Sequence, residues 1–326
     1  MTVLVTGGAG FIGSHLVEAL CAKGEAVRVL DDFSSGKPDN LRAVAKDIEV
    51  INGSIVDPDV CHHACAGVER VWHQAAIASV PQSVADPLHS HAVNLTGTLN
   101  MLVAARDAGV ARFVFASSSA IYGTNPDLPY HEELLPMPVS PYANQKLAGE
   151  LYTRQFASLY ALPTVSLRYF NIFGPRQDPT SQYAGVISAF LAALLDGRAP
   201  RLYGDGEQNR AFVYVADCVR ANLLAGFSDN PAILGGYFNI AADTPITINQ
   251  LLASAQQVLG TDFTPTHLPP RAGDVRYSVA NTDKARTQLG FTPQWSLEDG
   301  MRETAAWYKD WSSQHIVSNA GSIKYR

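Results

Sequence analysis

The chain has 326 residues, of which 47% are hydrophobic and 17% are charged, and its formal net charge is −6. This composition is typical of an ordinary globular protein and excludes a disordered chain. The acidic balance and the lack of a basic stripe argue against a nucleic-acid partner, because phosphate backbones are held by clustered lysine and arginine.

The cysteines and the N-terminus bear on the cellular setting. The four cysteines, Cys21, Cys61, Cys65 and Cys218, are too few for a disulfide framework in a chain of this length. The stretch CHHAC has no second ligand pair at a zinc-site spacing, so we expect a short polar helix and no metal there. The sequence shows no signal peptide and no run of about 18 apolar residues, so we expect a cytoplasmic protein without a membrane partner.

The first half of the chain alternates short β-branched runs with helical patterns. The runs, in chain order, are TVLVT, AVRVLD, IEVIN, RVWHQAA and RFVFASSS, and PTVSLRYFNIFG adds a strand near residues 164–170. Alternation of this kind is typical of βαβ units, whose parallel sheet is buried on both faces by helices. We therefore predict an α/β fold built on a Rossmann-type doubly wound parallel sheet.

The character of the sequence changes after Asn171, where prolines, glycines and loops multiply and helices such as Val186–Leu195 are shorter. A smaller C-terminal substrate-binding lobe is therefore expected beside the sheet domain. The predicted division is a sheet domain at 1–170 that regains a stretch near 211–240, a lobe at 171–315 and a polar tail at 316–326.

A glycine-rich stretch, VTGGAGFIGSHL, lies between the first predicted strand and the first helix. Gly7 lets the chain turn sharply, Gly10 lets the backbone approach a diphosphate, and Gly13 lets helix and strand pack closely. The N-terminus of the helix offers free N–H groups to an anion. Because the glycines stand in the required strand–loop–helix context, they predict a dinucleotide site.

Asp31 ends the second predicted strand. A carboxylate at this place accepts hydrogen bonds from both ribose hydroxyls of a dinucleotide and repels a 2′-phosphate. The expected cofactor is therefore NAD in preference to NADP. Arg28 lies on the same predicted strand and would favour the 2′-phosphate of NADP if its side chain pointed to the ribose. The sequence does not give the direction of that side chain.

Residues 140–146 predict a catalytic helix. Ser140 suits an N-cap and Pro141 a first helical residue, so Tyr142 and Lys146 lie one turn apart on one face. A free tyrosine has a pKa of about 10, and an adjacent ammonium together with an oxidised nicotinamide favours the phenolate; a pKa near 7 takes about 4 kcal/mol. We predict that Tyr142 is the base of an alcohol oxidation. Alone, the spacing also fits a half-buried tyrosine beside a solvated lysine.

The serine run ASSSAIYG ends a strand at the carboxyl edge of the predicted sheet, where such folds bind their ligands. One hydroxyl there can hydrogen-bond the substrate oxygen and relay its proton to Tyr142. The pattern itself leaves Ser117, Ser118 and Ser119 open, because a serine at a strand end is also a common cap.

Together these motifs resemble the extended short-chain dehydrogenase/reductase family, and within it the UDP-sugar 4-epimerases of the UDP-galactose and UDP-N-acetylglucosamine type. The resemblance runs from about Thr2 to Trp311 and rests on the glycine loop, HQAA, SSSAIYG, SPYANQK, RYFNIFGPRQ, GDGEQNR and RAGDVRYSVAN. It implies bound NAD, a UDP-sugar substrate and a homodimer.

Carried over position by position, the resemblance also implies the site residues. The catalytic set is Ser118, Tyr142 and Lys146, with Ser117 as the alternative to Ser118. The implied cofactor contacts are Gly7, Gly10, Phe11, Ile12, Gly13, Asp31, Ser54, Ile55, Gln74, Ala75, Ala76, Asn94, Tyr142 and Lys146. The implied substrate contacts are Ser79, Ser118, Ser119, Asn171, Val186, Tyr203, Arg210, Arg271, Asp274 and Ser278.

Five of these positions have a stated role in the resemblance. Asn171, Arg210 and Arg271 resemble a diphosphate clamp, which arginine suits because its fixed fork of donors matches phosphate oxygens. Asp274 is expected near the uridine ribose. Tyr203 is expected against the uracil.

The chain departs from the family pattern at two places. Ser54 stands where the family commonly has an aspartate, which makes Ile55 the better adenine contact. The chain also reads RAF where RDF or RDY is common, which removes the carboxylate that orients Arg210 in the family. Neither change touches the residues that carry the chemistry.

The residues after the catalytic serine distinguish the reactions of the family. Related 4,6-dehydratases have an Asp-Glu pair there to eliminate water, whereas this chain has Ser119 and Ala120, which do not titrate. The 4-keto sugar can then only take back its hydride, so we predict NAD-dependent C4 epimerisation. The alternative of another class is a non-enzymatic NAD-binding regulator, against which the presence of both Tyr142 and Lys146 speaks.

In the family, sugar size depends on the residue that is Ser278 here. A tyrosine limits the pocket to plain hexoses, and a small residue admits N-acetyl groups. We therefore predict UDP-GlcNAc/UDP-GalNAc interconversion, with UDP-Glc/UDP-Gal also accepted. A UDP-glucuronate 4-epimerase is the alternative, because Arg168 or Arg176 could pair with a sugar carboxylate.

Overall fold

The computed structural model describes residues 1–178, 185–270 and 276–319. Seven parallel strands form one sheet in the order β11-β6-β5-β4-β1-β2-β3. These strands are β1 (Thr2–Thr6), β2 (Ala26–Asp31), β3 (Ile48–Asn52), β4 (Arg70–His73), β5 (Arg112–Ser118), β6 (Thr164–Tyr169) and β11 (Gly236–Ile240). The predicted Rossmann-type doubly wound parallel sheet is confirmed, and its strand order reverses between β1 and β4.

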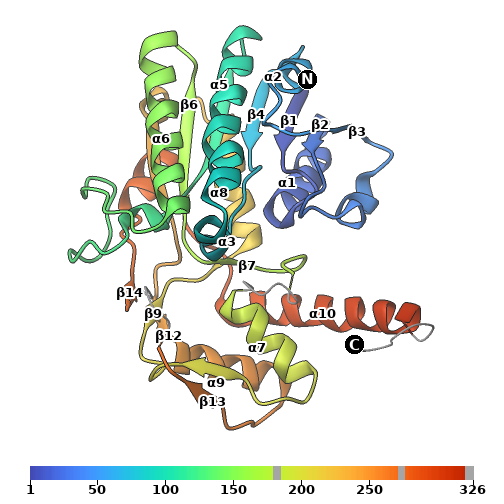
Figure 1. Cartoon of the computed structure of the whole chain (residues 1–326), viewed down its shortest axis with the longest axis vertical. Coiled ribbons are helices and arrows are strands. Elements are labelled where there is room, and N and C mark those ends of the chain that lie inside the picture. The colour runs from blue at the N-terminus through green and yellow to red at the C-terminus, as the bar shows by residue number, and fades with distance from the viewer. Residues whose placement is uncertain (179–184, 271–275, 320–326) are drawn as a thin grey trace.

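Helices cover both faces of this sheet (Figure 1). One face is covered by α1 (Phe11–Ala22) and α8 (Val215–Phe227), and the other by α2 (Pro58–Cys65), α5 (Thr98–Asp107) and α6 (Pro141–Tyr160), with the short α3 (Val80–Ala85) and α4 (Pro87–His91) nearby. Along β1, Val3 and Val5 join the cluster of Leu16, whereas Leu4 joins that of Met101. The apolar run of β1 thus serves two faces, because successive side chains point to opposite sides.

The C-terminal lobe, at the bottom of Figure 1, combines short strands with helices, one of which is long. Its helices are α7 (Val186–Leu195), α9 (Ile248–Leu259) and α10 (Leu297–Asn319), and its strands are β7 (Ile172–Phe173), β8 (Arg201–Tyr203), β9 (Asn209–Arg210), β10 (Val213–Tyr214), β12 (Ile246–Thr247), β13 (Thr266–Leu268) and β14 (Tyr277–Ser278). Shorter helical turns are η1 (Pro38–Val44), η2 (Ala92–Gly97), η3 (Ser119–Tyr122), η4 (Pro231–Ile233) and η5 (Ala285–Leu289). Because α10 continues to Asn319, the first residues of the predicted polar tail are helical.

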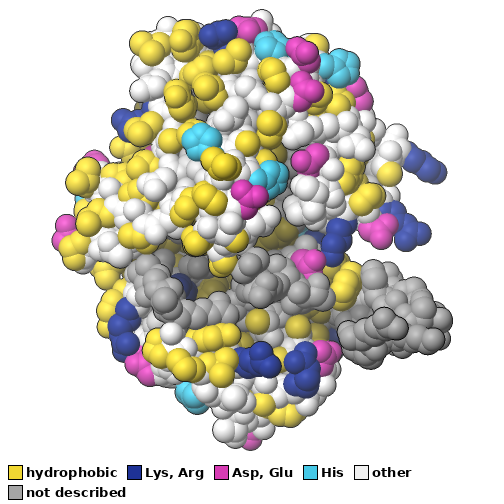
Figure 2. Space-filling view, in the orientation of Figure 1, with side chains coloured by type: hydrophobic (Ala, Val, Ile, Leu, Met, Phe, Trp, Pro, Cys, Tyr) yellow, Lys and Arg dark blue, Asp and Glu magenta, His cyan; other side chains and the backbone are white. Residues whose placement is uncertain are grey.

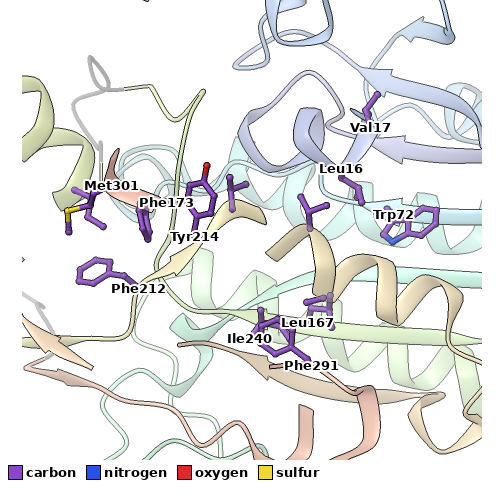
Figure 3. Packing of buried hydrophobic residues seen from close by; sticks show 14 of the residues in the cluster. Leu16, Val17, Trp72, Leu167, Phe173, Phe212, Tyr214, Ile240, Phe291 and Met301 are labelled. Atoms are coloured by element: carbon purple, nitrogen blue, oxygen red, sulfur yellow. The ribbon is translucent and has the colours of Figure 1, made fainter. Parts of the chain in front are cut away.

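One hydrophobic cluster continues from the sheet into the lobe (Figure 3). Leu16 and Trp72 lie at its sheet end, and Phe173, Tyr214 and Met301 lie at its lobe end. The rings of Phe173 and Tyr214 are 5.6 Å apart between centroids. The lobe therefore shares its core with the sheet domain and is held in place over the carboxyl ends of the strands.

The surface is mixed in character. On the face shown in Figure 2, lysine and arginine side chains are scattered among acidic and hydrophobic ones. Some large apolar side chains are exposed, among them Leu88 and Leu135. None of the helices that the structure describes is long and apolar enough to cross a membrane.

The turn from β1 into α1 depends on glycine. Gly7 has φ +66°, a left-handed conformation that side chains rarely adopt. A Cβ on Gly13 would lie 2.0 Å from the Gly7 carbonyl oxygen, whereas a Cβ on Gly10 would approach the same oxygen only to 3.2 Å. Gly13 therefore allows the close contact of helix and strand, whereas a Cβ on Gly10 would need a shift of only a few tenths of an ångström.

His73, at the end of β4, is buried in a hydrogen-bonded network. Its Nδ1 accepts from the Thr6 hydroxyl at 2.7 Å, and its Nε2 donates to Thr98 Oγ1 at 3.0 Å, because that hydroxyl itself donates to the Asn94 carbonyl. These partners assign a neutral ring with its proton on Nε2. Burial first, and the charge of Lys146 second, lower the pKa of His73 to about 3.

The stability of the fold should therefore fall in acid through His73. An unfolded histidine has a pKa of 6.5, so between pH 6.5 and about 3 the unfolded chain binds a proton that the folded one excludes. The contribution is complete above pH 6.5 and declines toward pH 3 by on the order of 4 kcal/mol. Urea unfolding across this range should show a shallower decline for His73→Gln; equal slopes for the two proteins would contradict the assignment.

Gly13→Ala should lower the free energy of unfolding by about 1–3 kcal/mol, because helix and strand must move apart to admit the methyl group. Gly10→Ala is the matched control in the same loop, since its φ of −75° suits alanine. Its loss should be clearly smaller. Urea unfolding of both variants, stripped of bound nucleotide, measures the difference, and equal losses would refute the packing role of Gly13.

Candidate active site

A cleft of about 1440 Å³ lies at the carboxyl ends of the parallel strands, beside the reversal of strand order. Its sheet side consists of the glycine loop, the residues after β2, the end of β5 and the start of α6. Its lobe side includes Asn171, Arg210, Arg276 and Ser278. A cleft of this size accommodates a dinucleotide and a second ligand side by side.

The glycine loop forms one end of the cleft. Its lining residues are Gly7, Gly10, Phe11, Ile12 and Gly13. Helix α1 begins directly after Gly10, and no side chain caps its N-terminus. The first N–H groups of the helix therefore face the cleft and suit the diphosphate of a dinucleotide.

Asp31 lines the same end and is 8% exposed. Its Oδ2 accepts from the Ala9 N–H and its Oδ1 from the Phe33 N–H, both at 2.8 Å. Burial raises the pKa of Asp31, and these two hydrogen bonds oppose the rise. The carboxylate is thus fixed by the backbone with lone pairs left to accept from ribose hydroxyls.

Arg28 does not reach this end of the cleft. Its Nε pairs with the Glu49 carboxylate at 2.8 Å, and its Nη1 donates to the Ala64 and Ala66 carbonyls. The guanidinium is therefore committed to the far side of β2 and does not meet a ribose phosphate. These residues fit NAD and disfavour a 2′-phosphate.

Three predicted catalytic side chains meet where β5 and α6 approach each other. Ser140 caps α6, because its Oγ accepts from the Ala143 N–H at 3.2 Å. Ser118 lies near the Tyr142 phenol and acts to lower its pKa. The Lys146 Nζ, one turn further on, donates to the Ala116 carbonyl at 2.8 Å.

The neighbouring serines differ in what they contact. Ser117 is turned away from Tyr142, and its hydroxyl donates to Glu150 Oε2 at 2.7 Å. Ser119 lines the cleft at the start of η3. The Ser117 hydroxyl is thus engaged by Glu150, whereas Ser118 acts on the Tyr142 phenol, which favours Ser118 over Ser117 as the reacting hydroxyl.

Tyr142 and Lys146 are buried away from water, and this burial determines the direction of their pKa shifts. Burial raises the pKa of Tyr142, and Ser118 only partly opposes the rise. Burial also lowers the pKa of Lys146 to about 7. The expected lowering of the tyrosine pKa is therefore not produced by the groups of the protein alone, because desolvation outweighs them.

Several predicted cofactor contacts line the cleft, and one supports it from beneath. Ile55, Gln74, Ala75 and Ala76 are lining residues. Asn94 is fully buried, where its Oδ1 accepts from the Ile77 N–H at 2.8 Å and its Nδ2 donates to Gln145 at 2.8 Å. Asn94 thus fixes the segment that follows β4, and its predicted contact with the cofactor stays a prediction.

Other predictions fall outside the cleft. Ser54 turns back to accept from the Val56 N–H at 3.3 Å, and Val186 and Tyr203 belong to α7 and β8, which pack within the lobe. These three residues are not among the described residues that line the cleft, and their contacts with a ligand stay predictions. Arg271 and Asp274 lie outside the described residues.

The lobe places its predicted substrate residues on paired strands. Asn171 donates to the Ala211 carbonyl at 3.0 Å, and the Arg210 Nη1 donates to the Asn209 carbonyl at 2.7 Å. Ser278 of β14 stands opposite Arg210 of β9 in the parallel register. All three predicted residues, together with Ser79 across the cleft, are lining residues.

Sequence reasoning missed Arg276, which also lines the cleft. Its guanidinium pairs with Asp205 at 2.9 Å, and both side chains are more than half exposed, so the pair contributes little to stability. The signal was its place in the motif RAGDVRYSVAN, two residues before Ser278. Arg210 and Arg276 give the lobe side of the cleft a positive wall.

The segment CHHAC belongs to α2, beneath the cleft. Cys61 donates to the Ile55 carbonyl at 3.2 Å, and burial raises the pKa of Cys61 and of Cys65 to about 12. Among the described residues, no three His, Cys, Asp or Glu side chains gather to hold a metal ion. The two thiols pack in the core under Ile55.

Comparison with known proteins identifies the family. The model of the NAD dependent epimerase/dehydratase family matches residues 3–241. A UDP-glucose 4-epimerase from Mycolicibacterium smegmatis is 39% identical over 314 residues, which cover 95% of this chain and 99% of that relative.

Two solved structures have the same fold over nearly their whole length. One is a UDP-N-acetylglucosamine 4-epimerase from Methanobrevibacter ruminantium in complex with UDP-N-acetylmuramic acid, with 40% identity, a TM-score of 0.91 and coverage of 95% of this chain and 98% of that one. The other is a UDP-glucose 4-epimerase from Thermus thermophilus in complex with NAD, with 39% identity, a TM-score of 0.85 and coverage of 95% and 99%. The chain therefore belongs to the NAD-dependent epimerase/dehydratase family, and both its resemblance to the 4-epimerases and its use of NAD are confirmed.

Proposed function

We propose that the chain interconverts C4 epimers of a UDP-hexose, most readily UDP-GlcNAc and UDP-GalNAc, and that it also accepts UDP-Glc and UDP-Gal. The observation that carries the proposal is that Tyr142, Lys146 and Ser118 line one cleft with the glycine loop and Asp31. In this proposal the sheet domain (1–170 with 211–240) holds NAD and the lobe (171–315) holds the UDP-sugar. A homodimer, which the resemblance implies, would cover the exposed Leu151 and Leu159 of α6.

The proposed reaction begins with the C4 hydroxyl bound to Ser118. The O–H and C4–H bonds break and a C4 carbonyl forms, while the hydroxyl proton passes through Ser118 to Tyr142. Bound NAD supplies the hydride acceptor and, when oxidised, a positive charge that favours the phenolate. Lys146, fixed by the Ala116 carbonyl, adds a second positive charge on the same side of the phenol. The reverse steps on the opposite sugar face, after the sugar has turned, give the epimer.

The composition of the cleft argues against a dehydratase. Elimination of water needs an acid and a base beside the sugar, and Ser119 and Ala120 supply neither. Among the described lining residues, the carboxylates are Asp31, Asp32 and Asp178, which lie at the dinucleotide end or beside it. A 4-keto sugar formed at Ser118 would therefore be reduced again at C4 and would not lose water.

The arginines suggested for a uronate are already engaged. Arg168 is buried and ion-paired to Glu150 at 2.6 Å. Arg176 is paired to Glu18 of α1 at 2.5 Å, on the dinucleotide side of the cleft. These pairings argue against a UDP-glucuronate 4-epimerase, because neither guanidinium faces the sugar end at Ser278.

Tyr142→Phe should lower kcat for C4 inversion by about 10²–10⁴-fold, because the base is lost while the helix is kept. The assay incubates the protein separately with UDP-GlcNAc, UDP-Glc and UDP-GlcA and follows C4 inversion by chromatography. Tyr152→Phe removes a hydroxyl from the same helix and should leave kcat unchanged. The proposal would be refuted if the wild-type protein inverted C4 of none of the three UDP-sugars, or if Tyr142→Phe kept full activity.

Ser278→Tyr should abolish turnover of the N-acetylated sugars and keep that of UDP-Glc and UDP-Gal, because the larger side chain fills the space beside the sugar. Ser278→Ala is the matched control and should retain both activities. The ratio of kcat/KM for UDP-GlcNAc to that for UDP-Glc measures the effect. A ratio that Ser278→Tyr leaves unchanged would show that the residue does not set the pocket size.

A further inference from the structure

The residues directly before Ser118 are held from helix α6. The Ser117 hydroxyl donates to Glu150 Oε2 at 2.7 Å. Glu150 lies one helical turn after Lys146, whose Nζ donates to the Ala116 carbonyl at 2.8 Å. Helix α6 is thus hydrogen-bonded to β5 at Ala116 and Ser117, the two residues immediately before Ser118.

Glu150 is held in turn by Arg168 of β6. The Arg168 Nε and Nη2 donate to the two carboxylate oxygens at 3.0 and 2.6 Å, which is a bidentate pair. The two side chains are 1% and 2% exposed. Arg168 also stands opposite Ser117 in the β5–β6 register, so strand, strand and helix meet at this pair.

The same guanidinium holds the chain after Ser118. The Arg168 Nη1 donates to the Tyr122 hydroxyl at 2.7 Å and to the Glu132 carbonyl at 3.2 Å. The Tyr122 hydroxyl passes its own hydrogen bond to Asn239 Oδ1 at 2.7 Å. Through Glu150 on one side and Tyr122 on the other, Arg168 fixes both ends of residues 118–121.

Stability does not account for an ion pair at this place. Taking two charges out of water costs about as much as their attraction returns, and apolar side chains of similar volume are often as stable. A hydrogen-bonded ion pair of fixed geometry does orient the groups bound to it. Orientation matters for catalysis, because a small displacement of a reacting group lowers the reaction rate strongly.

We propose that Glu150 and Arg168 form a positioning unit that sets the Ser118 hydroxyl against Tyr142. The unit acts through Ser117 and touches neither sugar nor cofactor. The inference rests on the proposed reaction, in which Ser118 relays the proton.

The test is Ser117→Ala, which cuts the link to the strand and leaves the ion pair intact. We expect kcat for C4 inversion to fall about tenfold with KM and bound NAD unchanged, and the thermal midpoint to fall only as far as the loss of one buried hydrogen bond requires. Ser117→Thr restores the hydroxyl and should restore kcat. The control is Ser166→Ala in the adjacent strand, because the buried Ser166 Oγ has no hydrogen-bond partner among the described residues, and its kcat should not change.

The double variant Glu150→Leu/Arg168→Met examines the pair itself. If the pair were only structural, apolar replacements that keep the thermal midpoint would also keep kcat. We expect the midpoint to be kept and kcat to fall at least tenfold. A folded double variant with wild-type kcat would overturn the proposal.

The ionisation of Tyr142 gives a readout that does not depend on the sugar. In the NAD-bound protein, the phenolate is titrated by absorbance as the difference from Tyr142→Phe. Ser117→Ala should raise the titration midpoint, because Ser118 lowers the pKa of this phenol. A wild-type protein inactive on every UDP-sugar would refute the proposed function alone; a midpoint and a kcat that Ser117→Ala leaves unmoved would overturn the positioning role.

Discussion

The close packing of α6 on β5 is the contact on which the site depends. Gly149 allows it, because a Cβ at this position would lie 2.8 Å from the Phe115 ring. Because the helix lies this close to the strand, Lys146 can donate to the Ala116 carbonyl at 2.8 Å and Glu150 can accept from Ser117 at 2.7 Å. The distance between the tyrosine on the helix and the serine on the strand therefore follows from backbone packing and not from the freedom of two side chains.

The same packing makes the site dry, with opposite consequences for its two titratable groups. Burial raises the pKa of Tyr142 and lowers that of Lys146 to about 7, so burial opposes the charged form of each group. In a dry site a nearby charge also acts more strongly than in water. An oxidised nicotinamide therefore has the greatest effect on the phenol where the protein itself disfavours the phenolate. In the proposed reaction, this arrangement would couple the ionisation of Tyr142 to the redox state of the cofactor.

The fold and the chemical centre could be predicted from the sequence because both follow from local patterns. Alternating runs gave the parallel sheet, and a four-residue spacing put Tyr142 and Lys146 on one face. The direction of a side chain could not be predicted, as Arg28 shows, whose pairing with Glu49 on the neighbouring strand no local pattern gives. The Glu150–Arg168 pair was also invisible, because one partner is on a helix and the other on a strand with no shared motif. Arg168 instead looked like a candidate for the substrate.

An epimerase must hold its substrate firmly at one end and loosely at the other, since the sugar has to turn over between the two hydride transfers. The structure separates these demands along the cleft. At the nucleotide end, Asn171 and Arg210 are tied to backbone carbonyls, and the lobe that carries them shares its core with the sheet. At the proposed sugar end, Ser278 is small, and Ser118 and Tyr142 line the same cleft from β5 and α6. Rigid walls around a roomy sugar end let the ring present either face to one immobile base, which a site that closed tightly on the sugar would prevent.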